Sequence, residues 1–155
     1  MVCLGNICRS PLAEGILQHK AKKAGLNWTV DSAGTGNWHV GKPPHELSQK
    51  VAQLHGVPIG QQKARQFEPE DMQYFDKIYF MDAQNLNDAR RMAGPLWEEK
   101  KAELLLNELY PGQNRSVPDP YFGEEPGYHQ VFSLLEKACD TIVARYRTLS
   151  LPQKG

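Results

Sequence analysis

The first eleven residues, MVCLGNICRSP, constrain the fold of this chain more than any other stretch. Ser10 followed by Pro11 predicts the start of a helix, with Ser10 as its N-cap and Pro11 as its first residue. Gly5 permits a tight curve of the chain shortly before this helix. Cys3 and Arg9 are therefore expected at the two ends of a short loop that leads directly into a helix N-terminus.

Residues 3–9, named the phosphate loop below, have the composition of an oxyanion-binding site. Backbone N–H groups of a tight loop at a helix N-terminus converge on one point and bind a tetrahedral anion. The same field stabilises a thiolate, so Cys3 is expected to be ionised and nucleophilic at neutral pH. Arg9 closes the loop with a planar fork that holds two oxygens at once, which a lysine cannot do. The residues leave one alternative open, a buried cysteine near a helix start with a solvated arginine.

A thiolate that attacks phosphorus needs a proton donor for the departing oxygen. Asp119 is the candidate, because Pro118 and Pro120 fix the loop that presents it. An Asp-Pro pair is also a common turn signal, so an ordinary turn residue is the competing interpretation. Within the phosphate loop, Ser10 can hydrogen-bond the sulfur. Asn6 can take a left-handed conformation or pin the loop to its neighbours.

Short apolar stretches alternate with longer helical patterns along the rest of the chain. Such alternation predicts parallel strands covered by helices, and hence an α/β fold. The length of 155 residues fits a single domain over residues 1–155. Hydrophobic spacing and capping residues predict strands at 28–31 and 77–81 and helices at 10–24, 47–55, 68–75, 82–93, 96–109 and 128–149.

Composition argues against several classes of protein. Eighteen basic and eighteen acidic side chains cancel, so no overall charge favours nucleic acid or an anionic membrane. No apolar run approaches the ~20 residues of a membrane span, and no signal peptide is evident. Three cysteines, an odd number, do not indicate a disulfide scaffold, so a cytoplasmic location is expected. His39, His45 and His55 have no metal-ligand spacing, and no metal is expected.

The motifs give the sequence a family resemblance. The segment CLGNICRSP, which begins at Cys3, resembles the active-site loop of the low-molecular-weight protein tyrosine phosphatases nearly letter for letter. Four further blocks are similar and occur in the same order, namely DSAGT at 31–35, ARQ at 64–66, MD at 81–82 and DPY at 119–121. The resemblance extends over roughly residues 2–148. It implies a flavodoxin-like three-layer sandwich in which helices flank a four-stranded parallel sheet.

The resemblance also implies a two-step hydrolysis of phosphotyrosine that needs no metal and no cofactor. Cys3 would form a phosphocysteine, and Arg9 would stabilise the transferring group. Asp119 would act first as an acid and then as a base towards water, and Ser10 would assist the leaving thiolate. The expected substrate is a phosphotyrosine-containing protein or a small aryl phosphate, with phosphate as the product. A monomer is expected.

The substrate pocket is the next implication of the resemblance. Asn6 and Ser32 would belong to a hydrogen-bond network that holds the phosphate loop. Trp38 and Tyr121 would form aromatic walls, although a loop tryptophan taken alone is a common packing anchor. The expected substrate-binding residues are Leu4, Gly5, Asn6, Ile7, Cys8, Ser10, Trp38 and Tyr121.

Three positions depart from the family pattern. Only two residues precede Cys3, whereas the family has a full central strand there, so either residues precede Met1 or this strand is missing or distorted. Gln62 stands where some relatives carry a histidine in the network around the loop asparagine, and a glutamine can still hydrogen-bond. Phe122 replaces the second tyrosine of the DPYY form, which leaves a phosphorylation switch to Tyr121 alone.

Alternative functions and one redox question stay open. An arsenate reductase on the same scaffold would need further cysteines to relay a disulfide, and only Cys8 and Cys139 remain, with Cys139 expected in the core. Protein-arginine phosphatases resemble this loop but carry threonine where this chain has Ile7. A phosphopeptide-binding module would keep the catalytic residues without turnover. A Cys3–Cys8 disulfide that protects the nucleophile and a simple buried Cys8 thiol are both open interpretations.

Overall fold

The computed structural model describes residues 1–150, and its centre is a four-stranded parallel sheet. The strands are β1 (Val2–Cys3), β2 (Ala33–Gly34), β3 (Ile78–Phe80) and β4 (Ala102–Leu104). Their order is β2-β1-β3-β4, and every pair of neighbours runs parallel. Parallel neighbours need crossover connections, which helices normally supply. The predicted four-stranded parallel sheet is confirmed.

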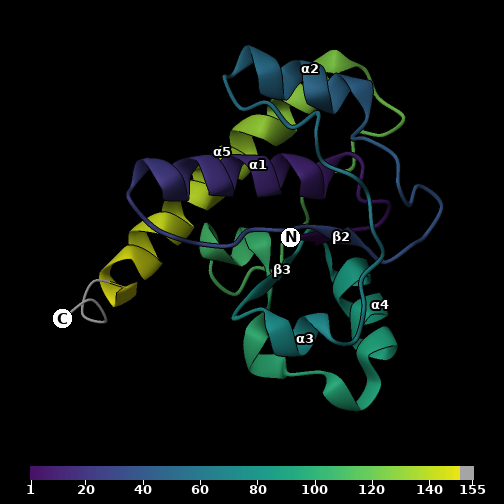
Figure 1. Ribbon diagram of the computed structural model, residues 1–155, viewed down its shortest axis with the longest axis vertical. Helices are drawn as coiled ribbons and strands as arrows, with labels where there is room; N and C mark the ends of the chain where they lie inside the picture. Colours follow the sequence, from purple (N-terminus) through teal and green to yellow (C-terminus); the bar gives the residue numbers. More distant parts are fainter. Residues whose placement is uncertain (151–155) are drawn as a thin grey trace.

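Helices cover both faces of this sheet. The described helices are α1 (Arg9–Lys23), α2 (Glu46–Leu54), α3 (Asp71–Tyr74), α4 (Ala83–Ala93) and α5 (Glu125–Ser150). Figure 1 shows α1, α2 and α5 on one side of the sheet and α3 and α4 on the other. Along β3, Tyr79 points into the first layer and Ile78 and Phe80 into the second, as strand geometry requires. The result is the three-layer sandwich that was expected.

β1 is only two residues long, yet it occupies the centre of the sheet. Val2 pairs with Ala33 on one side and with Phe80 on the other. The alternative in which this strand is missing is therefore wrong for the described structure. Because β1 ends at Cys3, it places the sulfur at the carboxyl edge of the sheet. Open α/β sheets form their binding crevices at this edge.

The start of α1 differs from the prediction. The helix begins at Arg9 with Cys8 as its N-cap, so the prediction of Ser10 as the N-cap is wrong. Cys8 already has φ and ψ of −115° and −76°, in the right-handed region, and the helix therefore starts inside the phosphate loop. The Ser10 hydroxyl instead contacts the Cys3 sulfur and the Asn6 amide.

The strand predicted at 28–31 is also displaced. The chain there is irregular, and β2 lies two residues further on. Part of this backbone bonds to a side chain of α1 instead of to a neighbouring strand, since Val30 N–H donates to Gln18 Oε1 at 3.3 Å. Pairing with the first strand begins only where Ala33 N–H donates to Met1 O at 3.0 Å.

The prediction of an α-helix at 96–109 is wrong. The segment 94–108 holds β4 and three short 3₁₀ turns, at Gly94–Leu96, Glu99–Lys101 and Leu105–Glu108. β4 pairs with all three residues of β3 at the edge of the sheet. Three consecutive leucines, 104–106, are buried. A helix buries every third or fourth residue on one face, so this run fits a strand that enters a turn.

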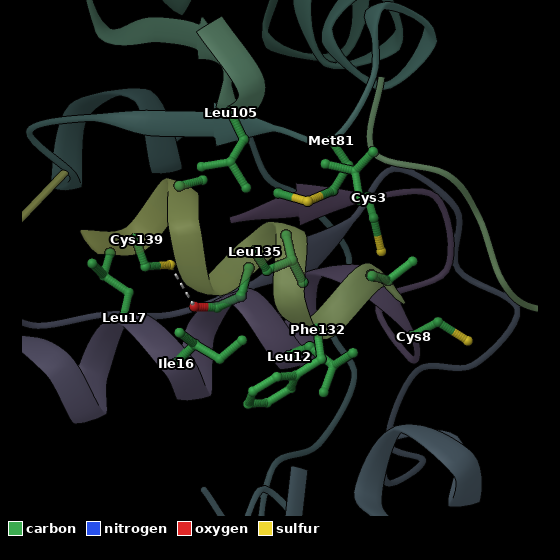
Figure 2. Packing of buried hydrophobic residues seen from close by; sticks show 14 of the residues in the cluster. Cys3, Cys8, Leu12, Ile16, Leu17, Met81, Leu105, Phe132, Leu135 and Cys139 are labelled. Carbon is green, nitrogen blue, oxygen red and sulfur yellow. Dashed lines mark hydrogen bonds between the residues drawn. The ribbon is translucent and has the colours of Figure 1, made fainter. Parts of the chain in front are cut away.

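The larger core lies where α5 packs across α1. Figure 2 shows Leu12 and Ile16 of α1 close to Phe132 and Leu135 of α5. Cys139 is fully buried in the same layer, which confirms its predicted place in the core. No helix within residues 1–150 combines the length and the apolar character that a membrane crossing requires.

Truncating Leu135 to alanine should lower the free energy of unfolding by about 2–5 kcal/mol, because this side chain is fully buried. Leu54→Ala is the matched control. Leu54 is 65% exposed at the end of α2, and its truncation should change stability by less than about 0.5 kcal/mol. Urea unfolding followed by circular dichroism measures both, and equal losses would contradict the packing described.

Candidate active site

The phosphate loop joins the end of β1 to the start of α1. Figure 2 shows Cys3 and Cys8 at one end of the packed core, with Cys3 beside Met81 of the neighbouring strand connection. Both cysteines are buried, at 2% and 4% exposure. The sulfur of Cys3 therefore lies at the floor of a loop rather than on an open surface.

Neighbouring segments bind the carbonyl groups of the loop from outside. The bonds run from Thr35 N–H to Cys3 O (3.0 Å), from Gly36 N–H to Leu4 O (2.8 Å) and from His45 N–H to Ile7 O (2.7 Å). Carbonyl groups that are held outward leave backbone N–H groups free to face the centre of the loop. One of them is seen doing so, since Asn6 N–H donates to Cys3 Sγ at 3.3 Å. Such a ring of donors binds anions.

Asn6 holds the shape of the loop. Its φ of 57° is left-handed, a conformation that asparagine tolerates better than most residues. Its side-chain Oδ1 accepts from Arg65 N–H at 3.0 Å. Its Nδ2 donates to Ser10 Oγ at 2.8 Å and to Ser32 Oγ at 2.9 Å. The Asn6 amide thus joins the loop to α1 and to the segments around β2.

Ser10 contacts the sulfur directly. Its Oγ lies 2.9 Å from Cys3 Sγ, and the Ser10 side chain is fully buried. Because Asn6 Nδ2 donates to this oxygen, the hydroxyl hydrogen is free to point at the sulfur. The sulfur is then within hydrogen-bond reach of both the Ser10 hydroxyl and the Asn6 backbone N–H.

Arg9 is a buried cation that two carboxylates surround. Its Nη1 donates to Asp82 Oδ2 at 2.7 Å and to Val117 O at 3.0 Å. Its Nη2 lies 3.7 Å from Asp119 Oδ2. Asp82 is itself fixed, because its Oδ1 caps α4 by accepting from Asn85 N–H at 2.8 Å. A buried charge needs such partners, and here they also set the direction of the guanidinium.

Asp119 lies in the loop between η3 (Leu105–Glu108) and α5. Its Oδ1 accepts from Tyr121 N–H at 3.1 Å, and its side chain is 45% exposed. The structure therefore brings Asp119 to the phosphate loop from 110 residues away in the sequence. One carboxylate oxygen is held by the backbone, and the other faces Arg9.

Aromatic side chains stand beside the loop. The Tyr121 ring packs on His45 with centroids 5.8 Å apart and lies 6.2 Å from the His39 ring. Trp38 is 65% exposed and covers the backbone of Gly36, where any added Cβ would overlap its ring. Of the two predicted walls, Tyr121 is therefore joined to the site by ring contacts, and Trp38 lies across a glycine of the adjacent loop.

Cys8 is in a different environment from Cys3. Its sulfur lies 3.7 Å from Tyr128 Oη, and burial raises the pKa of the Cys8 thiol to about 11. Figure 2 shows the Cys8 sulfur pointing away from Cys3. A Cys3–Cys8 disulfide would require the loop to rearrange, and it stays a prediction.

The network around the loop also contains Asp82 and Glu14, to which the sequence analysis gave no role. Asp82 forms an ion pair with Arg9. Its position just after the buried strand predicted at 77–81 is the signal by which sequence reasoning could have identified it as a site residue. Glu14 Oε1 accepts from the Ser32 hydroxyl at 2.6 Å, and burial raises the pKa of Glu14. Gln62 does hydrogen-bond, but it donates to Pro11 O at 3.1 Å rather than to the loop asparagine.

Gly34 of β2 allows the loop to pack closely against the sheet. A Cβ placed on Gly34 would lie 2.8 Å from Leu4 O and 3.0 Å from Asn6 N. Both atoms belong to the backbone of the phosphate loop, so neither can move aside without deforming it. This position needs a glycine because of contact with a distant segment, which its local sequence does not reveal.

A cavity of about 690 Å³ lies elsewhere, at the amino ends of the strands. Met1, Val30 and Ile78 are among the residues that line it, and neither Cys3 nor Arg9 does. The candidate active site is therefore defined by its chemistry rather than by this cavity.

A sequence model of the low molecular weight phosphotyrosine protein phosphatases matches residues 1–150. The chain belongs to this family. Family membership confirms the predicted resemblance and the predicted class of enzyme, a protein-tyrosine-phosphatase.

Relatives within the family match almost the whole chain. The low molecular weight protein-tyrosine-phosphatase YfkJ of Bacillus subtilis is 39% identical over 145 residues, which cover 92% of this chain and 91% of YfkJ. The crystal structure of YfkJ superposes with a TM-score of 0.86 at 38% identity, covering 96% of this chain and 93% of that one. The human low molecular weight phosphotyrosine protein phosphatase is 36% identical over 140 residues, with 89% and 88% covered. The crystal structure of DARP, a Drosophila arginine phosphatase, has a TM-score of 0.85 at 33% identity and covers 94% of both chains.

Gly34→Ala should disable this phosphatase without unfolding it. The added Cβ displaces the backbone of the phosphate loop, and misplacing reacting groups by about 1 Å can cost about 100-fold in rate. We therefore expect kcat/KM for p-nitrophenyl phosphate to fall by about 100-fold. Gly127→Ala is the matched control, because nothing lies within 4 Å of its Cβ position. Unchanged activity in Gly34→Ala would contradict the close packing of β2 against the loop.

Proposed function

We propose that this phosphatase hydrolyses phosphotyrosine in proteins, as well as small aryl phosphates, through a phosphocysteine intermediate. The observation that carries the proposal is the convergence of three groups. The Cys3 sulfur lies at the floor of the phosphate loop, Arg9 closes the same loop, and the Arg9 guanidinium approaches Asp119 Oδ2 at 3.7 Å. A nucleophile, an anion clamp and a proton donor are thus within reach of one phosphate group.

The first step transfers the phosphoryl group to sulfur. The Cys3 thiolate attacks phosphorus, so an S–P bond forms while the P–O bond to the tyrosine oxygen breaks. Protonated Asp119 gives its proton to the departing oxygen, which leaves as a neutral phenol. The loop N–H groups stabilise the charge on the three oxygens that remain on phosphorus.

The second step releases phosphate. Asp119, now a carboxylate, takes a proton from water while the water oxygen attacks phosphorus and the S–P bond breaks. Inorganic phosphate leaves, the Cys3 thiolate returns, and Asp119 is again protonated. Ser10 supports the departure of the thiolate, because its hydroxyl lies 2.9 Å from the sulfur and can donate to it.

Arg9 can hold the phosphate and remain anchored at the same time. A guanidinium has five N–H donors in a fixed fork. The two donors of Nη1 are directed at Asp82 and Val117, which leaves the Nε and Nη2 edge for two phosphate oxygens. This division between anchoring and binding supports a bidentate clamp, which a lysine could not supply.

The shape of the site favours an aryl phosphate. The backbone N–H groups of Leu4, Gly5, Asn6, Ile7 and Cys8 would bind the phosphate, with Trp38 and Tyr121 flanking the tyrosine ring. Offset or edge-to-face ring contacts add about 0.5–1.5 kcal/mol beyond the burial of area. The phosphorus of the shorter phosphoserine would stop short of the sulfur, and near-attack geometry is lost steeply with distance.

We further propose a single domain over residues 1–155 that acts as a monomer in the cytoplasm. Two arguments support this setting. Cys3, Arg9 and Asp119 come from one chain, so the site needs no second copy. A thiolate nucleophile must stay reduced to work, and the cytoplasm keeps thiols reduced. Residues 151–155 of this domain lie outside the part that the structure describes.

The alternatives differ in their support. The likeness to DARP favours an arginine phosphatase as the second candidate, whereas Ile7 in place of threonine argues against it. An arsenate reductase needs a mobile relay cysteine, and Cys139 is fully buried with its thiol donating to Ala13 O at 3.9 Å. A binding module without turnover is countered by the proton donor that Asp119 supplies beside Arg9.

Replacing Asp119 should slow substrates to a degree that depends on their leaving group. Asp119→Asn cannot donate a proton, so aryl phosphates with poor leaving groups should slow by about 100–10,000-fold. Those with good leaving groups, such as p-nitrophenol, depart without a proton and should slow much less. Rates across a series of substituted phenyl phosphates measure this difference. Equal slowing across the series would remove Asp119 from the role of acid.

A panel of substrates tests the proposed function itself. Phosphotyrosine, phosphoserine and phosphoarginine peptides of one backbone sequence should differ strongly in kcat/KM, with phosphotyrosine the best substrate. Cys3→Ser should bind phosphate but turn over none of the peptides, because a serine hydroxyl is not ionised. Trp38→Ala should weaken the preference for the aryl phosphate while small aryl phosphates are still hydrolysed.

Three outcomes of this panel would count against the proposal. Comparable values for phosphotyrosine and phosphoserine would leave a general phosphomonoesterase. Faster turnover of phosphoarginine would move the function to the second candidate. Wild-type-like turnover in Cys3→Ser would remove the nucleophile.

A further inference from the structure

Three segments around the candidate active site meet at His45, a residue that the proposed reaction does not use. His45 lies just before α2 and is half-buried. Its backbone N–H donates to Ile7 O of the phosphate loop at 2.7 Å. Its ring contacts the rings of Tyr128, which belongs to α5, and of Tyr121, which follows Asp119 by two residues. His45 therefore connects two helices to the loop that carries the acid.

The imidazole of His45 is itself held in one orientation. Its Nδ1 accepts from Leu47 N–H at 3.1 Å, so the side chain caps α2. Its ring stacks on Tyr128 with centroids 5.3 Å apart and an angle of 24° between the planes, and Tyr128 is fully buried. Tyr128 Oη lies 3.4 Å from Nδ1 of the same ring. A side chain that packing and hydrogen bonds lock in this way can position a neighbour precisely.

The loop that carries the acid is attached weakly through its backbone. We call residues 118–123 the acid loop. Its hydrogen bonds are internal, because Tyr121 N–H donates to Asp119 Oδ1 at 3.1 Å and Gly123 N–H donates to Pro120 O at 2.8 Å. Within the part of the chain that the structure describes, no backbone group of the acid loop hydrogen-bonds to another segment. The position of this loop therefore depends on side-chain contacts.

Tyr121 makes the ring contacts that attach the acid loop. Pro120 is buried, and the next ring in the chain, that of Tyr121, meets His45 edge-on with centroids 5.8 Å apart at 74°. The Tyr121 ring also lies 6.2 Å from the ring of His39. Of the two histidines, His45 has the shorter contact and is the one that caps a helix.

The path from His45 to the acid is short. The His45 ring supports the Tyr121 ring, and the Tyr121 N–H holds one carboxylate oxygen of Asp119. The side chain of Asp119 is 45% exposed, so packing alone does not confine it. A general acid must lie within hydrogen-bond reach of the atom that receives its proton. A small shift of Tyr121 would therefore take the carboxyl group out of reach.

We propose that His45 is a positioning residue for the general acid. Its ring holds Tyr121, and through the Tyr121 N–H it holds the Asp119 carboxyl group beside the leaving oxygen. The inference rests on the proposed function, in which Asp119 donates the proton. This role concerns proton donation only, so a substrate whose leaving group departs without a proton does not need it.

The test replaces the ring of His45 and keeps the helix cap. Asparagine is a favoured N-cap, so His45→Asn retains a side-chain acceptor for α2 and the backbone N–H that binds Ile7 O. We expect kcat/KM for phenyl phosphate, which has a poor leaving group, to fall by about tenfold. The value for p-nitrophenyl phosphate should change by less than about twofold. The inhibition constant of inorganic phosphate should stay the same, because the phosphate loop and Arg9 are unaltered.

Two control variants separate the ring from the cap. His45→Phe keeps a ring and loses the acceptor, so it should lower the melting temperature but retain the wild-type ratio of the two substrates. His55→Asn removes the histidine ring at the other end of α2, which stacks on Phe132 of α5 with centroids 4.1 Å apart. It should change neither substrate.

A double variant links the ring to the acid. Once Asp119→Asn has removed the proton, His45→Asn should slow phenyl phosphate no further. Effects of residues that act as one unit are not additive, whereas independent losses multiply in rate.

Several outcomes would overturn the inference. An unchanged rate for phenyl phosphate in His45→Asn would show that the ring does not position the acid. Equal slowing of both substrates, or a further loss in the double variant, would give His45 a general structural role. A loss in His45→Phe as large as in His45→Asn would assign the effect to the helix cap.

The Asp119→Asn variant distinguishes failure of the inference from failure of the proposed function. If it slows both substrates equally, Asp119 is not the acid, and the proposed mechanism and the inference are both wrong. If it slows phenyl phosphate selectively and His45→Asn does not, only the inference is wrong.

Discussion

The shape of the phosphate loop depends on one buried amide, the side chain of Asn6. Its carbonyl oxygen accepts from Arg65 N–H, and its nitrogen donates to Ser10 and Ser32. These bonds hold a residue with a positive φ in place. The backbone groups around the sulfur of Cys3 therefore keep their directions before any anion arrives. Preorganisation of this kind is what lets donors stabilise a transition state without first reorganising.

A very short strand fixes the position of Cys3 in the sheet. β1 has two residues, yet its pairing on both sides fixes the position of Cys3 at the carboxyl edge. β3 ends beside it, and Asp82 follows β3 after one residue. Parallel strands that end together thus deliver a nucleophile and the anchor of the arginine to one place. The fold contributes geometry, and the loops contribute the reacting groups.

The sequence predicted what is local and missed what is long-range. The phosphate loop could be predicted because its cysteine, glycine, arginine and helix start are contiguous. The need for Gly34 could not, since it arises from contact with the backbone of Leu4. β4 was predicted as helix because its leucines fit a helical spacing, and only pairing with β3 decides its type. Asp119 was found because two prolines and a nucleophile elsewhere made an acid necessary.

The groups of the site come from two very different parts of the chain. Residues 3–10 supply the sulfur, the anion-binding backbone and the arginine in one continuous stretch, whereas the acid belongs to a surface loop more than a hundred residues later. Retention of phosphate and chemical turnover are therefore separable properties of this molecule. A cut or a partial unfolding confined to the later loop would leave a protein that still binds phosphate but cleaves esters with poor leaving groups slowly, because those esters depend most on the acid.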